Sequence, residues 1–258
     1  MQFTVTHNKM NYAGDFQHPI DISIPTFASE NSAAAWYVSP TRIEPVRTER
    51  FTGSVVEGGT VNFRDIAFNP HGNTTHVECV GHISEEVYSI NQSLQQFTHI
   101  AKLVTLTPKK YTGTATEFLT NEDLVIDQMD LEELNLEGFS ALIIRTLPNT
   151  SEKLTRRWDN TNWPFLTPNA AIYLREKGIK HLLIDLPSVD KELDGGLMLA
   201  HKAFWHYPES TRHDATITEM IYVKPEVLDG IYLLNLQMAS FENDASPCKP
   251  ILYKIIPF

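Results

Sequence analysis

The chain has 258 residues, of which 42% are hydrophobic and 21% are charged, a balance typical of a globular protein rather than a disordered or fibrous one. Acidic residues outnumber basic residues by 32 to 21, so the formal net charge is -11 and phosphate backbones or anionic lipids would repel the chain. Composition therefore argues against nucleic-acid and membrane-surface partners.

Cysteine usage points to a reducing compartment. Cys79 and Cys248 are too few for a disulfide framework and form no CxxC pair. The longest apolar runs, at 141–144 and 181–186, are far shorter than the ~20 residues that a membrane-spanning helix needs. We therefore expect a cytoplasmic, soluble protein.

Short runs rich in β-branched and aromatic residues predict strands. They lie at 2–7, 20–25, 60–68, 100–108, 231–239 and 251–258. The later part of the chain alternates helix with buried strand. The predicted helices cover 120–135, 167–178 and 197–205, and the predicted buried strands cover 138–146 and 179–187.

The helix at 167–178 has clear end signals. Thr167 is suited to cap its N-terminus, Pro168 fits the first helical position, and Gly178 is a typical stop. No repeat, low-complexity tract or long linker divides the chain. We therefore predict one domain over 1–258, of the α/β class and rich in strands.

Potential metal-binding chemistry concentrates in a single segment. His71, His76 and His82 fall within twelve residues together with Glu78. If 75–82 is extended, the two-residue period of a strand places His76, Glu78 and His82 on one face. His71 is out of phase, but it belongs to the turn-forming sequence Pro-His-Gly-Asn, which can fold it back over the same site.

Imidazole and carboxylate groups together suit zinc, manganese or iron, and a catalytic ion needs several such ligands around an open position. The alternative is that these histidines are ordinary residues of a Thr/Asn-rich surface loop. Other catalytic signatures are absent: the chain has no HExxH, GxSxG, GxGxxG or P-loop motif.

Several segments, in order, resemble the metal-dependent cyclase family that includes bacterial kynurenine formamidase and isatin hydrolase. The segment 75–82 is similar to the THxDxPxH part of the family motif HxGTHxDxPxH, with Glu78 in the aspartate position. Four further segments resemble parts of the family pattern. Residues 35–40 resemble its tryptophan-containing loop, and 138–146 resemble its strand ending in Arg-Thr. Residues 178–190 resemble its strand with the DxPSxD turn, and 244–249 resemble its closing DGSP loop.

The resemblance implies the swivelling β/β/α fold of this family and a site for one or two divalent ions. In it, His71, His76 and Glu78 correspond to metal ligands, His201 and Glu219 complete the set, and His82 takes the position of the proton donor and acceptor. Trp36 matches a residue that lines the substrate pocket. The resemblance also implies a homodimer or homotetramer and a place in the tryptophan–kynurenine catabolic route.

Three features depart from the family pattern. His71 lies five residues before His76, where the family has four. Glu78 replaces an aspartate and so lengthens the ligand arm by one methylene. The stretch between His201 and Glu219 is longer than in the family and contains His206 and His213, either of which is an alternative ligand.

The implied chemistry is hydrolysis of a small amide, formamide or lactam, as in an arylformamidase, because a divalent ion activates water and polarises a carbonyl at neutral pH. His82 would move the proton, since imidazole suits general acid–base work. Tyr37, Phe204 and Trp205 join Trp36 as possible aromatic walls, or serve as core. Two other functions stay open, namely a metal-dependent cyclase or dehydratase and a non-catalytic metal- or ligand-binding module.

Overall fold

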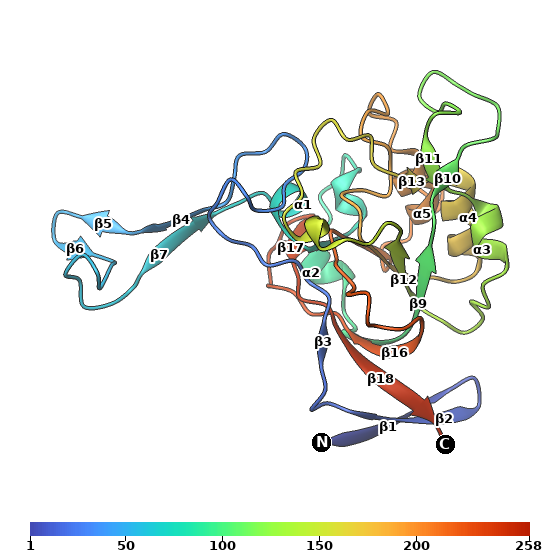
Figure 1. Ribbon diagram of the computed structural model, residues 1–258, viewed down its shortest axis with the longest axis horizontal. Coiled ribbons are helices and arrows are strands. Elements are labelled where there is room, and N and C mark those ends of the chain that lie inside the picture. The colour runs from blue at the N-terminus through green and yellow to red at the C-terminus, as the bar shows by residue number, and fades with distance from the viewer.

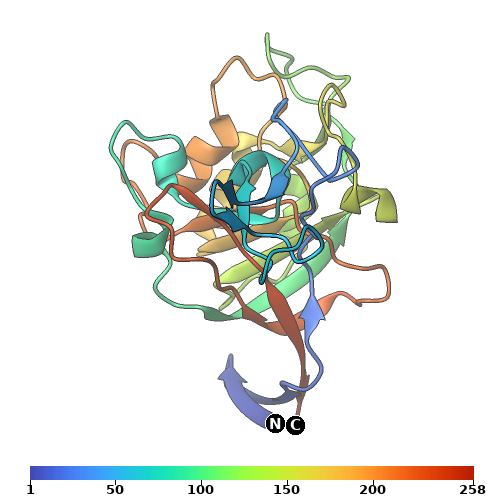
Figure 2. The ribbon, with the colours of Figure 1, turned by 90° about the vertical axis from the view of Figure 1, so that its left-hand side faces the viewer.

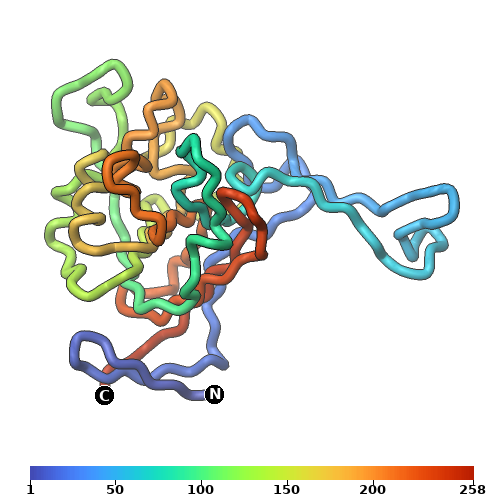
Figure 3. The backbone as a smooth tube through the Cα atoms, turned by 180° about the vertical axis from the view of Figure 1, so that it is seen from behind, coloured from blue at the N-terminus to red at the C-terminus, as the bar shows by residue number.

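The computed structural model describes all residues from 1 to 258 and shows a body built on one large mixed sheet, from which a long arm projects (Figure 1). The arm points to the left in Figure 1, toward the viewer in Figure 2, and to the right in Figure 3. Both termini lie together at the bottom of the body, beside the N-terminal hairpin.

The large sheet has the strand order β1-β2-β18-β16-β9-β12-β14-β15-β8-β17, with β3 paired to β18. Its strands are β1 (Gln2–His7), β2 (Met10–Asp15), β3 (Ile20–Asp21), β8 (His76–Glu78), β9 (Thr98–Leu106), β12 (Ala141–Thr146), β14 (His181–Ile184), β15 (Thr216–Glu219), β16 (Gly230–Asn235), β17 (Ala245–Pro247) and β18 (Ile251–Pro257). The strands β9, β12, β14 and β15 run parallel, and both ends of the sheet continue with antiparallel pairs.

The centre of the sheet is buried on both faces, which explains its continuous apolar sequence. In β12, Leu142 and Ile144 join the larger core cluster, while Ala141 and Ile143 join a second cluster on the opposite face. The helices α3 (Gln128–Glu132), α4 (Pro168–Glu176) and α5 (Leu199–Trp205) lie on the side of the larger cluster, and α1 (Pro70–Asn73) and α2 (Ile90–Ser93) are single turns elsewhere.

Smaller sheets complete the fold. The strands β10 (Lys109–Lys110), β11 (Leu124–Ile126) and β13 (Phe165–Leu166) form one of them. The arm contains the pair β4 (Arg42–Pro45) and β7 (Arg64–Ala67) and, at its tip, the pair β5 (Arg47–Thr48) and β6 (Phe51–Thr52). The described 3₁₀ turns are Val80–His82 and Ser151–Leu154.

The predicted α/β, strand-rich class is confirmed, and so are the end signals of α4. Thr167 Oγ1 accepts a hydrogen bond from the Ala170 N–H, Pro168 opens the helix, and Gly178 adopts φ +82°. The helix predicted over 120–135 is wrong in its first half. Residues 124–126 instead form β11, because Val125 and Ile126 pair with Phe165 and Leu166 of β13, a partner distant in sequence.

Other predicted strands exist but are shorter or shifted. The segment 20–25 forms only the two-residue β3, and 60–68 forms the four-residue β7 of the arm. None of the helices combines the length and the hydropathy that crossing a bilayer requires.

Candidate metal centre

Two histidines and two acidic residues meet where β8 pairs with β15. His76 and Glu78 share one face of β8, while Val77 between them packs into the core on the other face. Glu219, the last residue of β15, lies directly opposite His76 in the antiparallel register. His201 comes from α5, and its Nε2 lies 3.1 Å from Glu78 Oε1. All four side chains are buried.

His71 and His82 enter the same cluster from either side of β8. Asn69 caps α1 by accepting a hydrogen bond from the Gly72 N–H, and this single turn carries His71 over the site. His71 Nδ1 lies 3.0 Å from Glu78 Oε2, and His82 Nε2 lies 4.0 Å from the same oxygen. The two imidazole rings stack with centroids 4.2 Å apart.

The segment 75–82 is not extended throughout, contrary to the prediction. The strand β8 ends at Glu78, and Val80–His82 is a 3₁₀ turn. His82 still reaches the cluster, because the turn returns the chain toward Asp244 and leaves His82 Nδ1 3.4 Å from Asp244 Oδ2.

The cluster contains buried polar atoms that the protein leaves without a hydrogen bond. His76 Nε2 and Glu78 Oε2 both lack a partner, since the contact of His71 with Glu78 Oε2 lacks hydrogen-bond geometry. Such orphaned atoms are rare in protein interiors and indicate a missing ligand or ion. His76 Nε2 lies 3.7 Å from Glu78 Oε2 and 3.5 Å from Glu219 Oε2. An imidazole nitrogen converging with carboxylate oxygens is a ligand set suited to divalent zinc, manganese or iron, so the residues fit the implied metal.

Potential ligand atoms form three overlapping groups, and within each group the atoms lie within 4.8 Å of one another. The groups are His71–His76–Glu78, His71–His82–Asp244 and Glu78–His82–His201. Glu78, His71 and His82 each belong to two of these groups, and Glu78 directs one oxygen toward His71 and the other toward His201.

Charge is strongly coupled across the cluster. Burial alone would lower the pKa of His71, but the carboxylates of Asp244 and Glu78 raise it to about 10. Burial likewise opposes protonation of His201, yet Asp190 and Glu78 raise its pKa well above the ordinary value. Burial would raise the pKa of the Glu78 carboxyl, but His82 and His201 hold it well below its usual range. The negative charge of these buried carboxylates is therefore stabilised by positive charge beside it, which either bound protons or a metal ion can supply.

A second layer of residues fixes the potential ligands in place. Asp190 Oδ2 lies 2.6 Å from His201 Nδ1 and also accepts a hydrogen bond from the His201 N–H, which orients the ring with Nε2 toward Glu78. The Val189 N–H donates to Glu219 Oε1 over 2.8 Å. Carboxylate–histidine contacts of this kind hold the ring orientation that metal binding needs.

A cavity of about 510 Å³ opens onto the centre. Its wall includes Trp36, His71, His82, Lys202 and Glu219. Trp36 lies in the left-handed region at φ +63°, and its ring packs edge-on against Trp163 with centroids 4.9 Å apart. Phe204 and Trp205 are fully buried in the core, so they do not form the aromatic wall.

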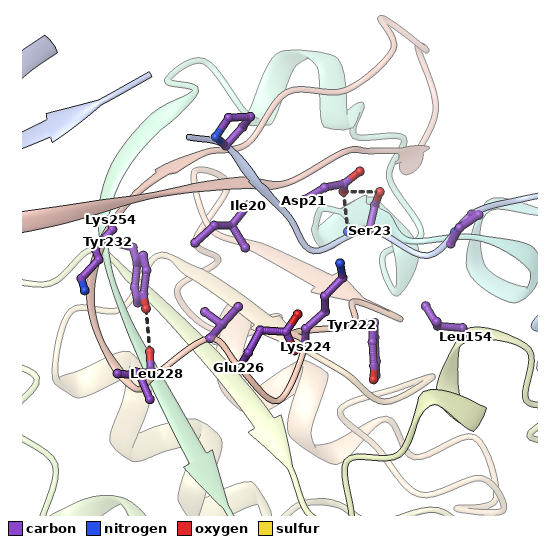
Figure 4. A pocket seen from close by; sticks show the side chains of 13 residues that line it. Ile20, Asp21, Ser23, Leu154, Tyr222, Lys224, Glu226, Leu228, Tyr232 and Lys254 are labelled. Carbon is purple, nitrogen blue, oxygen red and sulfur yellow. Dashed lines mark hydrogen bonds between the residues drawn. The ribbon is translucent and has the colours of Figure 1, made fainter. Parts of the chain in front are cut away.

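A larger hollow of about 670 Å³ lies elsewhere on the body (Figure 4). Ile20, Asp21 and Ser23 line one side of it, and Tyr222 and Lys224 line the other. It contains no histidine and none of the groups of potential metal ligands. The smaller cavity is therefore the candidate active site.

The structure brings together the six residues that the sequence analysis assigned as ligands or as the acid–base group. They are His71, His76, Glu78, His82, His201 and Glu219. His206 ends α5 and His213 packs against Tyr88 at 4.6 Å, so neither competes with His201. Sequence reasoning missed the parts played by Asp190 and Asp244, whose only signal was membership of the two loops that resemble the family.

Comparison with known proteins shows which family the chain belongs to. A family model described as "Putative cyclase" matches residues 15–191, which is more than half of the chain. Kynurenine formamidase of Bacillus thuringiensis (strain Al Hakam) is 28% identical over 200 residues, covering 77% of this chain and 83% of that protein. The corresponding protein of Bacillus mycoides (strain KBAB4) is 29% identical over 183 residues, covering 67% of this chain and 82% of its own.

Solved structures share the fold. A predicted metal-dependent hydrolase from Bacillus stearothermophilus superposes with a TM-score of 0.63 at 17% identity, covering 92% of this chain and 98% of its own. An isatin hydrolase bound to the product analogue thioisatinate gives 0.60 at 14% identity, covering 93% and 92%. Because the family model matches more than half of the chain, the chain belongs to the cyclase family.

Proposed function

We propose that this protein is a metal-dependent hydrolase that cleaves the C–N bond of a small amide, formamide or lactam, with aryl formamides as the first substrates to test. The observation that carries the proposal is the pair of orphaned atoms, His76 Nε2 and Glu78 Oε2, buried beside His201 and Glu219 next to an open cavity. The names of the Bacillus relatives and of the isatin hydrolase support C–N hydrolysis as the reaction class.

The metal ligands in this proposal are His71, His76, Glu78, His201 and Glu219. When bound, a divalent ion lowers the pKa of water toward ~7 and polarises a carbonyl group, so no serine or cysteine nucleophile is needed. We propose zinc, with manganese or iron as the alternatives that the same ligand types accept.

His82 is the proposed general base and acid. It lines the cavity and is 27% exposed, so both solvent and substrate reach it. Asp244 lies 3.4 Å from His82 Nδ1, which turns Nε2 toward the centre. In the reaction, His82 takes a proton from the attacking water. It returns that proton to the leaving nitrogen as the C–N bond breaks, and the acyl carbon keeps the oxygen of the water.

Trp36 is the proposed aromatic wall. The hydrogen bond from the Tyr37 N–H to Asp159 and the contact of Trp36 with Trp163 fix this loop beside the cavity. A flat aromatic ring placed there orients the substrate amide, and aryl amines leave more readily than alkyl amines.

Elemental analysis of protein purified without a histidine tag or added metal tests the centre directly. The wild type should hold one or two equivalents of a divalent ion, and the double variant His76→Ala, Glu78→Ala should hold none. The metal-loaded wild type should hydrolyse formanilide, and the double variant should not. If the metal-loaded protein hydrolyses no formamide, lactam or lactone, the protein is a non-catalytic metal- or ligand-binding module and the proposed hydrolase function is wrong.

We further propose that residues 1–258 form one catalytic domain and that the protein assembles into a homo-oligomer. The backbone hydrogen bonds of the arm lie within the arm itself, for example from the Val46 N–H to the Phe63 carbonyl. The arm also exposes Val56, Phe63 and Ile66, which are 97%, 59% and 60% accessible. An isolated two-stranded ribbon is marginal in water, so a second copy that covers these side chains would stabilise it.

We also propose a cytoplasmic location, because Cys79 and Cys248 are both free thiols buried in the fold.

A further inference from the structure

Lys202 differs from every other lysine in the protein. Six lysines form ion pairs with carboxylates: Lys109, Lys110, Lys153, Lys180, Lys191 and Lys249. Lys102 donates to a backbone carbonyl, and Lys177 lies over the ring of Tyr173. Of the four that remain without a partner, Lys9, Lys224 and Lys254 are exposed. Lys202 alone is partly buried and has no carboxylate, carbonyl or aromatic partner.

Lys202 is one of the residues that line the cavity of the candidate metal centre. It follows His201 on α5, and the imidazole of His201 points at Glu78. Successive residues of a helix are turned by about 100°, so the two side chains diverge from one backbone position. The Lys202 side chain therefore leaves α5 in a different direction from the His201 imidazole, and the residue forms part of the cavity wall.

Other polar groups in the cavity wall also present free donors. The Asn69 side-chain oxygen accepts from the Gly72 N–H, which leaves its amide hydrogens unpaired. Ser188 Oγ accepts from the Asp190 N–H, and its own hydrogen has no acceptor in the protein. A wall of unpaired donors that includes a cation selects a ligand rich in acceptors and negatively charged.

The negative charge around Lys202 makes its lack of a partner unusual. The protein carries a net charge of -11, which opposes the approach of an anion. The nearby carboxylates of Glu78 and Glu219 already contact histidines at the centre, so Lys202 is not needed to balance them. Lys202 differs from the three exposed lysines without a partner because it is partly buried in a cavity wall, and a ligand that supplies the missing charge explains this position best.

We propose that Lys202 binds a carboxylate of the substrate, so that the natural substrate is an anionic aromatic amide rather than a neutral one. This inference rests on the proposed hydrolase function for the position of the scissile bond. The cleaved amide lies at the His/Glu centre, the ring lies against Trp36, and the carboxylate lies at the Lys202 ammonium group.

The test compares formanilide with its ortho-, meta- and para-carboxyl derivatives. The wild type should show a KM at least tenfold lower for one carboxyl isomer than for formanilide, because a charge-assisted hydrogen bond is stronger than a neutral one. Lys202→Met keeps the length of the side chain and removes the charge. It should raise that KM at least tenfold, and it should raise the KM for formanilide by a much smaller factor.

Lys202→Arg should recover most of the lost affinity, and Lys9→Met, which removes an exposed lysine on the N-terminal hairpin, should change nothing. The inference is overturned if no carboxyl isomer is preferred by the wild type, or if Lys202→Met affects formanilide as strongly as the preferred isomer.

A binding measurement separates this inference from the proposed function. Calorimetric titration of the metal-loaded protein with the isomeric aminobenzoates and with aniline requires no turnover. Tighter binding of an aminobenzoate that Lys202→Met weakens at least tenfold supports the carboxylate site even if no formamide is cleaved. If the protein hydrolyses formanilide but Lys202→Met leaves the affinity for the aminobenzoates unchanged, the hydrolase function is supported and the carboxylate site is refuted.

Discussion

Glu219 lies directly opposite His76 in the antiparallel β15–β8 pair, and its Oε2 is 3.5 Å from His76 Nε2. The register of the sheet therefore aligns two proposed ligands that lie 143 residues apart in the sequence. Neighbouring strands hold such pairs rigidly, so little reorganisation is needed when an ion binds.

Removal of the His82 imidazole should abolish proton transfer without loss of the bound metal. His82→Ala should lower kcat on formanilide at least ~100-fold, the usual scale for loss of a general acid–base group. Metal content measured on the same sample should stay at the wild-type value. Wild-type turnover by this variant would remove His82 from the mechanism, and loss of the metal would instead make it a ligand.

Asp190 should control metal affinity through His201. Asp190→Asn keeps an oxygen for the backbone N–H groups of α5 but loses the charge beside His201 Nδ1, so metal affinity should fall about 10–100-fold. Competition with a chromophoric chelator measures this change. Asp194→Asn is the matched control, because Asp194 accepts from backbone N–H groups of the same loop without touching His201. Equal affinities in both variants would contradict the positioning role.

Acid should destabilise the fold through His181 at the end of the sheet away from the metal. Burial, reinforced by His99 and Lys180, lowers the pKa of His181 to about 3, whereas an exposed histidine titrates near ~6.5. Arg212 also opposes protonation and Asp214 favours it. Between these two pKa values the unfolded chain binds a proton that the folded chain does not. The stabilising contribution is therefore complete above pH ~6.5 and is lost as the pH falls toward 3.

Urea unfolding of metal-free protein at a series of pH values from 7.5 to 4.5 checks this expectation. The His181→Gln variant, which cannot take up the proton, should lose less stability across that range than the wild type. If the free energy of unfolding falls equally with pH in the two proteins, His181 is not the cause of the loss of stability in acid.

Trp36 should determine affinity for aromatic substrates. Trp36→Ala removes the flat wall and should raise KM for formanilide about tenfold, while Trp36→Phe should retain most of the affinity. Steady-state kinetics of the two variants make the comparison. An unchanged KM in Trp36→Ala would place the substrate ring elsewhere in the cavity.

The arm should hold the oligomer together. The double variant Phe63→Ser, Ile66→Ser removes two exposed apolar side chains and should shift the protein toward a monomer of 29.3 kDa. Light scattering coupled to gel filtration at several concentrations gives the mass. Val87→Ser is the control, since Val87 is 97% exposed but lies outside the arm. A wild-type protein that is already monomeric would refute the proposed role of the arm.

Local patterns in the sequence predicted some elements well. Alternation of exposed and inward residues marks β1, and the capping residues around α4 define its ends because those signals act within a few positions. The segment 120–135 misled because its acidic, Leu-rich composition favours a helix, whereas β11 forms through partners at 109–110 and 165–166. Such non-local pairing leaves no periodic trace in a three-residue strand.

The same distinction applies to the site. His71, His76, Glu78 and His82 are close in sequence, so their type and spacing sufficed to mark them. His201 and Glu219 were found only through family resemblance, since their positions depend on α5 and on the register of β15. Asp190, Asp244 and Lys202 were missed because only tertiary structure shows which aspartates touch a histidine and which lysine lacks a partner.

The position of β8 between β15 and β17 also determines when the centre can form. Both neighbours come from the C-terminal part of the chain, at 216–219 and 245–247, although β8 itself lies at 76–78. During synthesis the first histidines therefore emerge long before the strands that must enclose them. Capture of the proposed metal would consequently be a late event in the biogenesis of this protein, and a chain truncated before β17 would expose one edge of the strand that carries His76 and Glu78.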